Sequence, residues 1–253
     1  MNNEDQPQAV KRSLHGGTPP PRGRVEASRS DPRKPDLPRQ RLPLAGGVYR
    51  DVKRTARQGE VDDVANALAV AGEAMEEGDV SKAIEYLSWA ASRAPRSVPI
   101  REGLGVAYYL AGQFEEAQRE LQAYRRISGR ADQNHLLADC ARALDRPDRV
   151  LELIDEMAEA VEANKVPLER LVEGLIVQAG LQADSGDYNG ALATLDRTPL
   201  PDGLGPAHAR TWYAAGDIAE RMGDRGRAAE SFEAVMTVDD EFLDVAERLQ
   251  DLI

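Results

Sequence analysis

The sequence predicts an all-α protein built from pairs of helices that stack on one another. Apolar residues make up 42% of the 253 residues, yet aromatic residues make up only 5%. This composition suits close packing of helices better than a β-sheet, which favours β-branched and aromatic residues. From about residue 60 onwards the apolar residues recur with a helical period, and one short unit recurs along the chain.

The recurring unit is clearest in residues 103–121, GLGVAYYLAGQFEEAQREL. This stretch predicts two short helices joined by a tight turn, with its small and large residues spaced so that each set shares a helical face. The positions that define the unit are Leu104, Gly105, Tyr108, Gly112, Ala117 and Leu121.

These positions resemble the signature of the tetratricopeptide repeat (TPR) family, and Ala83 and Ala117 are spaced by the period of about 34 residues typical of that repeat. The resemblance implies a right-handed α-solenoid of about five TPR-like helix pairs that binds other proteins. The chain also resembles a group of actinobacterial TPR proteins that have a basic Pro/Arg-rich amino terminus and a phrase similar to residues 120–133. The predicted pairs span about 64–97, 98–131, 131–164, 172–205 and 209–242.

Each pair places a small residue after its turn, where two helix axes approach closely. This residue is alanine in four pairs and Val150 in the degenerate third pair. The turn position favours glycine, because the chain there is expected to have a positive φ. The third pair has no glycine at its turn, and Pro147 is expected to begin its second helix. The alanines are Ala83, Ala117, Ala191 and Ala228, and the glycines are Gly78, Gly112, Gly186 and Gly223.

Four regions are predicted along the chain. Residues 1–46 form a disordered basic tail, because eight of the 15 prolines lie within residues 1–45 and large apolar residues are scarce there. Residues 47–59 form a basic lead-in helix, residues 60–242 the repeats, and residues 243–253 a capping helix that covers the last repeat.

The charge is unevenly distributed. Residues 1–57 hold 13 Lys and Arg against 6 Asp and Glu, whereas the whole chain has a net charge of −12. A basic arm on an acidic body indicates an interaction tail: the arm would neutralise nucleic-acid phosphates, or it would serve only as a solubilising leader. The candidate nucleic-acid residues are Arg24, Arg29, Arg33, Lys34, Arg39, Arg41, Arg50, Lys53, Arg54 and Arg57.

In TPR proteins the concave groove is lined by first-helix residues at fixed positions, and the resemblance carries that role to this chain. The groove is expected to be acidic, with two tyrosines as stacking surfaces, and to bind a basic peptide. The alternative is that its acids are solvated helix faces. Leu68 and Gly72 replace the Lys and Asn that grip a terminal carboxylate, which excludes that subclass. The candidates are Glu102, Tyr109, Asp132, His135, Asp139, Arg142, Glu173, Asp184, Arg210, Tyr213, Asp217 and Glu220.

Nothing in the sequence predicts catalysis, a cofactor or a metal. His135 and Asp139 share a helical face, but a zinc site needs three or four ligands. A single cysteine, Cys140, excludes an internal disulfide framework and fits a reducing compartment. The sequence shows neither a secretory signal nor an apolar run long enough to cross a membrane, so the cytoplasm is the expected location.

The leading hypothesis is therefore a non-enzymatic TPR scaffold that binds a protein or peptide segment in its concave acidic groove. The alternative is an RNA- or ribosome-associated factor that uses the basic amino-terminal arm. A third interpretation follows from the charge asymmetry: the basic tail folds back within the same molecule and covers the acidic groove.

Overall fold

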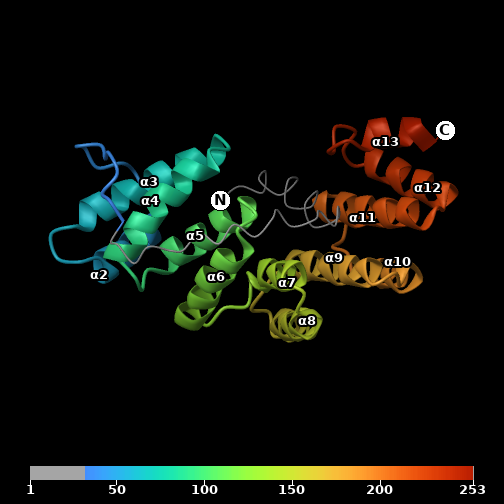
Figure 1. The fold of residues 1–253 in the computed structure, drawn as a ribbon, viewed down its shortest axis with the longest axis horizontal. Coiled ribbons are helices and arrows are strands. Elements are labelled where there is room, and N and C mark those ends of the chain that lie inside the picture. The colour runs from blue at the N-terminus through green and yellow to red at the C-terminus, as the bar shows by residue number, and fades with distance from the viewer. Residues whose placement is uncertain (1–31, 253) are drawn as a thin grey trace. The chain divides into compact units, whose positions relative to one another are not determined.

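A computed structural model describes residues 32–252, and the predictions for residues 1–31 lie outside this range. Every regular element in the described range is a helix, so the all-α prediction is confirmed there (Figure 1). The described residues fall into two compact units, residues 32–130 and residues 131–252, which we call the amino-terminal and the carboxy-terminal unit. The boundary lies between the second and third predicted pairs.

The amino-terminal unit contains two antiparallel helix pairs and one lead-in helix. The pairs are α3/α4 and α5/α6, and α4 packs on α5 so that the two pairs stack. Helix α2 contacts α3 and α5. The helices are α2 (Gly46–Thr55), α3 (Val61–Glu76), α4 (Val80–Arg93), α5 (Val98–Leu110) and α6 (Phe114–Ser128).

The carboxy-terminal unit stacks three pairs in the same manner. The second helix of each pair contacts the first helix of the next, and α13 packs on α12 where a further pair would follow. All five predicted helix pairs are thus present. The helices are α7 (Asn134–Ala143), α8 (Pro147–Glu162), α9 (Leu168–Asp184), α10 (Tyr188–Asp196), α11 (Pro206–Met222), α12 (Arg225–Met236) and α13 (Val245–Leu252).

The turns within the pairs follow the sequence prediction. The four turn glycines have φ between 73° and 88°, which costs glycine no steric clash. In the third pair Asp145 adopts this left-handed conformation at φ 55°, and Pro147 begins α8. Three second helices are capped by an aspartate whose carboxylate accepts a main-chain N–H of the first turn; these are Asp79, Asp187 and Asp224.

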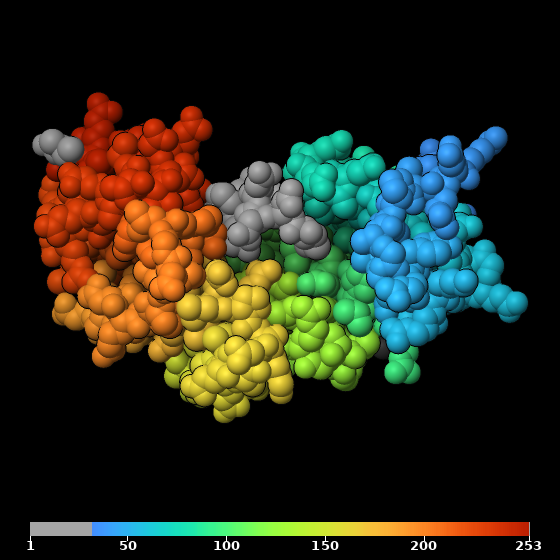
Figure 2. All heavy atoms as spheres, turned by 180° about the vertical axis from the view of Figure 1, so that it is seen from behind, coloured from blue at the N-terminus to red at the C-terminus, as the bar shows by residue number. Residues whose placement is uncertain are grey.

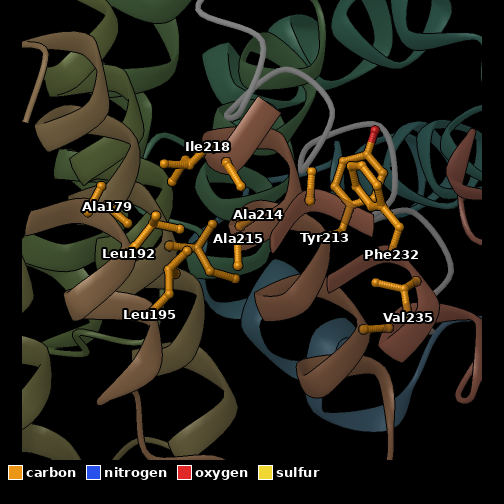
Figure 3. Packing of buried hydrophobic residues seen from close by; sticks show 14 of the residues in the cluster. Ala179, Leu192, Leu195, Tyr213, Ala214, Ala215, Ile218, Phe232 and Val235 are labelled. Atoms are coloured by element: carbon orange, nitrogen blue, oxygen red, sulfur yellow. The ribbon is translucent and has the colours of Figure 1, made fainter. Parts of the chain in front are cut away.

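Small residues let the helices of a pair approach closely, as predicted. The four alanines after the turns are fully buried. A Cβ on Gly105 would lie 2.7 Å from the Leu121 side chain, and one on Gly216 would lie 2.5 Å from the Phe232 ring. Figure 3 shows Phe232 beside Tyr213 in the core of the carboxy-terminal unit. Each close approach therefore requires one glycine and one large residue in the same pair.

Residues 32–45, which we call the strap, differ from the prediction of disorder. They form neither helix nor strand, yet they pack against α3 and α4 of their own unit. In Figure 2 the blue start of the described chain lies on the surface of this unit. The side chains of α3 and α4 supply hydrogen bonds that an extended proline-rich chain cannot make within itself.

Candidate functional site

The first helices of the three carboxy-terminal pairs form one continuous set, because α9 contacts both α7 and α11. Most of the candidate groove residues lie on these helices, and we call their shared charged surface the first-helix face. Its charged members are Asp139, Arg142, Arg170, Glu173, Asp184, Arg210, Asp217, Glu220 and Arg221.

Arg142 of α7 is linked to α9 by Asp184, and through that carboxylate to Arg221 of α11, at the carboxyl ends of α9 and α11. Its Nε lies 2.9 Å from Asp139 Oδ1, and its Nη1 lies 2.5 Å from Asp184 Oδ2. Arg221 of α11 contacts the other oxygen of Asp184 at 3.0 Å. Burial lowers the pKa of Arg142, but the two carboxylates more than offset this, so its pKa lies above the ordinary value. This junction holds α7, α9 and α11 in register.

A second charged layer lies nearer the amino ends of the same helices. The buried guanidinium of Arg210 forms an ion pair with the Glu173 carboxylate. Burial raises the pKa of Glu173, although Arg210 opposes the shift. The Nη1 of Arg170 lies 3.4 Å from the Nε2 of His135. Burial, with the nearby charge of Arg170, lowers the pKa of His135 to about 3, so its imidazole is neutral at pH 7.

Helix α13 contributes the last cation. Arg248 donates to Asp217 Oδ1 at 3.0 Å and also contacts the Glu220 carboxylate. Its guanidinium lies 4.7 Å from the centre of the Phe232 ring. Hydrogen bonds to Glu220 and Tyr213 raise the pKa of Arg248 against the lowering effect of burial. The capping helix thus neutralises Asp217 and Glu220, two acids that were predicted to bind a ligand in the groove.

The two tyrosines proposed as stacking surfaces are buried. Tyr213 packs between the Phe232 and Phe242 rings, at 5.7 and 5.6 Å between ring centres, and its hydroxyl donates to Asp244 at 2.5 Å. Burial and this bond raise the pKa of Tyr213. Tyr109 has an exposure of 3% and lies edge-on to a phenylalanine of its own pair. Both rings therefore belong to the cores of their pairs.

The remaining groove candidates do not join the junctions of the first-helix face. Glu102 is half-buried on α5 of the amino-terminal unit, and Asp132 is buried just before α7. Three arginines that were not among the groove candidates, Arg170, Arg221 and Arg248, bring positive charge to the acids. With them the face has both signs of charge, arranged as ion pairs, and no acidic strip.

The described basic candidates divide into two groups. Lys34 lies 2.5 Å from Asp63, and the Arg41 guanidinium lies 4.7 Å from the Tyr49 ring centre, so both are engaged by their own unit. The others have exposed side chains, most of them on or beside α2, where Arg54 also pairs with Asp51. These are Arg33, Arg39, Arg50, Lys53, Arg54 and Arg57. Arg24 and Arg29 lie outside the described residues.

The described residues contain neither a metal cluster nor a membrane-spanning helix. Among residues 32–252, no group of three or more His, Cys, Asp or Glu side chains is placed to hold a metal ion. Within the same residues, no helix combines the length and apolarity needed to cross a bilayer. Cys140 is buried in α7.

Comparison with known families supports the repeat prediction. Residues 74–133 and residues 209–242 each match a model of the tetratricopeptide repeat. TPR repeats are present in both units. The first match spans the α5/α6 pair, with Gly105 at its close approach, and the second spans most of the α11/α12 pair, with Gly216 at the same position. The predicted signature is therefore confirmed in those two pairs.

A solved structure shares a distant likeness with this chain. It is the crystal structure of YrrB, described as a TPR protein with an unusual peptide-binding site, at 17% sequence identity and a TM-score of 0.44, covering 73% of this chain and 91% of that one. No curated protein sequence matches this chain.

Proposed function

We propose that this protein is a non-enzymatic TPR scaffold that binds a protein segment across the first-helix face of its carboxy-terminal unit. The observation that carries the proposal is the junction of Arg142, Asp184 and Arg221, which fixes three first helices as one preformed surface. A preformed surface lowers the ordering cost of binding a flexible partner. A cytoplasmic setting, where its single cysteine would stay reduced, is part of this proposal.

The paired charges change the ligand that the face would accept. A strongly basic peptide would have to displace arginines that already neutralise the acids, whereas a segment carrying both signs can exchange partners with the half-exposed pairs. Asp184 and Arg221 have side-chain exposures of 32% and 29%, so this pair is the most accessible to such an exchange. We therefore expect a ligand of mixed charge.

Affinity capture with the full chain tests this function. The face variant carries Asp184→Asn, which keeps side-chain size, and Arg221→Gln, which shortens the side chain; both remove charge and keep a polar group. A matched control carries Arg149→Gln and Glu152→Gln, an exposed pair on the second helix α8. We expect at least one protein that the wild type and the α8 control retain and the face variant loses. Identical retained proteins in all three would contradict the proposal.

A second candidate function is binding of RNA through the basic arm, and the exposed basic side chains of α2 favour it. Arg50, Lys53 and Arg54 lie on this helix, and Arg57 follows it directly. Because phosphate contacts release counterions, such binding would weaken steeply with salt. The resemblance to actinobacterial TPR proteins with a basic tail fits this candidate but brings no activity with it.

RNA titrations at several salt concentrations test the arm. Replacing Arg50, Lys53, Arg54 and Arg57 with glutamine should reduce the slope of log affinity against log salt by about 0.7 for each lost contact to a single strand. Replacing Arg119, Arg125, Arg126 and Arg130, around α6 of the same unit, removes equal charge and serves as the control. An unchanged slope in the α2 variant would exclude the arm as the RNA-binding element.

A further inference from the structure

The strap is held by its main chain as a bound peptide would be. The side chain of Asn66, which is 2% exposed, accepts the Leu42 N–H at 2.8 Å and donates to the carbonyl oxygens of Pro38 and Gln40 at 2.9 and 3.2 Å. One amide thus satisfies three main-chain groups of an extended chain. The hydroxyl of Tyr86 donates to a fourth, the Asp36 carbonyl, at 2.8 Å.

Side chains of the strap meet specific partners at its start. The ammonium of Lys34 lies 2.5 Å from Asp63 Oδ2 and 5.8 Å from the centre of the Trp89 ring. Pro35 is buried. Leu37 packs against the apolar core of the unit. Lys34 therefore contacts both a carboxylate and an aromatic ring, Leu37 contacts the apolar core, and Pro35, between them in the sequence, is buried.

The second half of the strap continues the same contacts. Leu44 packs against the core of the unit, and the Arg41 guanidinium lies over the ring of Tyr49. The Tyr49 hydroxyl is 3.3 Å from Asp62, a neighbour of Asp63 in the first turn of α3. Of the four cations of the strap, Lys34 thus pairs directly with an acid at the start of α3, and Arg41 packs on a tyrosine that a second acid there holds, which gives the contact charge complementarity at Lys34.

Main-chain hydrogen bonds combined with pockets for alternate side chains are how proteins recognise extended peptides. An apolar edge that only needed covering would not require a buried amide directed at three main-chain groups. We propose that the α3–α4 face around Asn66 is a peptide-binding site for extended segments containing lysine, proline and leucine. Residues 34–44 are its occupant within the chain, and a partner segment of the same chemistry replaces them.

This site is distinct from the first-helix face. Its contact residues are Asp63, Asn66, Tyr86 and Trp89, none of which was a groove candidate. The tail does fold back on its own unit in the described residues, but onto α3 and α4. The two proposals can therefore fail independently.

A binding titration in the full chain tests the site. The strap is disabled by Leu37→Asp and Leu44→Asp, which leave the contact residues intact. The probe is a synthetic peptide of residues 32–45, followed by Trp89 fluorescence in a Trp212→Phe background. We expect saturable binding at least tenfold tighter than to the chain with an intact strap, because the tethered occupant competes at about millimolar effective concentration.

A matched pair of variants sharpens this titration. Adding Asn66→Ala to the disabled-strap chain should weaken peptide binding at least tenfold, whereas Asn189→Ala, an exposed asparagine on α10, should leave it unchanged. Equal affinity for the Asn66 and Asn189 variants, or for the intact and disabled straps, would overturn the proposal.

Trypsin cleavage provides a test that leaves the strap sequence unchanged. The bond between Arg41 and Leu42 carries the N–H that Asn66 accepts, so the bound strap should protect it. In an otherwise wild-type chain, Asn66→Ala should speed cleavage at this bond at least fivefold, measured by mass spectrometry. Trypsin should cleave the Asn189→Ala variant at this bond at the wild-type rate. Equal rates for the two variants would contradict the assigned role of Asn66.

Discussion

The two units use the same helix pair but hold their first helices together by different chemistry. In the amino-terminal unit, α3 presents mostly small and apolar residues, and a half-buried pair such as Arg101–Glu120 lies within the α5/α6 pair. In the carboxy-terminal unit, the buried guanidinium groups of Arg142 and Arg210 form ion pairs with acids of neighbouring first helices. The difference shows that charged residues can take the place of small ones where first helices meet.

The use of ion pairs in place of small residues affects the stability of the carboxy-terminal unit. A buried ion pair gains little net stability, because desolvation offsets the attraction, but breaking it leaves an uncompensated charge inside the protein. The stability of the carboxy-terminal unit is therefore sensitive to loss of either partner of these ion pairs. The amino-terminal unit depends on packing volume and on the strap. Each unit holds one tryptophan, Trp89 or Trp212, so a Trp→Phe background reports on one unit at a time.

The largest effect is expected from Arg142→Ala. The side chains of Arg142 and Asp139 are 8% and 4% exposed, so the change removes a buried cation from a buried ion pair and should lower the free energy of unfolding by about 3–5 kcal/mol. Arg101→Ala, whose pair is 18% and 19% exposed, should cost about 1 kcal/mol or less. Denaturant titrations that follow the tryptophan of each unit measure both. Equal costs would remove the contrast between the units.

The next effect is a pH dependence confined to the carboxy-terminal unit. The folded pKa of His135, about 3, lies below the ordinary value of 6.5, so its stability contribution is present above pH 6.5 and is lost as pH falls towards 3. At pH 5 this loss amounts to about 2 kcal/mol. His135→Asn should abolish that part of the acid destabilisation, measured by urea titration with Trp212 at pH 7 and pH 5. The same slope in both chains would exclude His135 as its source.

A smaller difference in stability is expected between alanine substitutions at Gly216 and at Gly105, the two glycines where helices approach closely. Gly216→Ala places a methyl group against the Phe232 ring, which is held between Tyr213 and Arg248. Overpacking costs about 1–3 kcal/mol and helix propensity returns about 1 kcal/mol, so a net loss of about 1 kcal/mol is expected. Gly105→Ala meets the Leu121 side chain at 2.7 Å and its main-chain nitrogen at 3.2 Å. A new Leu121 rotamer can relieve the side-chain contacts but not the main-chain one, so a loss smaller than that of Gly216→Ala is expected. Thermal unfolding of both variants measures the difference, and a larger loss at Gly105 would reverse the interpretation.

The smallest effect is a gain. Gln113 precedes α6 at φ −90°, ψ 72°, close to the φ −82°, ψ 72° of the capping residue Asp79, yet its side chain makes no capping bond. Gln113→Asp should therefore cap α6 and stabilise the amino-terminal unit by about 1 kcal/mol. Unfolding followed by Trp89 checks this, with Gln113→Ala as the control. A variant no more stable than that control would show that backbone geometry alone does not define the cap.

The sequence predicted the features that depend on local backbone chemistry. Turn glycines, the buried Ala117 and Ala228, and the helix start at Pro147 follow from spacing within one pair, so a single sequence contains the information. The ion pair between Arg142 and Asp184 spans 42 residues, and its partner choice depends on the register between separate pairs. Residue type showed that Asp184 was charged but could not show that an arginine already neutralised it.

The ordered conformation of the strap was not predicted, for a related reason. Proline-rich composition indicates that a segment cannot form a core of its own, and residues 32–45 do not. Order there comes from Asn66, 24 residues or more along the chain, whose role in binding main-chain groups is not encoded in a hydrophobic period. A polar residue among the alanines of α3 was the one available signal.

Hydrogen–deuterium exchange on the full-length Arg142→Met chain tests most directly whether ion pairs hold the first-helix face together. Because Arg142 joins α7 to α9 and Arg221 extends the junction to α11, the substitution should speed exchange in these three helices and leave α3 to α6 at wild-type rates. Unchanged exchange throughout, or an equal increase in both units, would contradict the ion-pair origin of the face and remove the basis for the proposed binding surface.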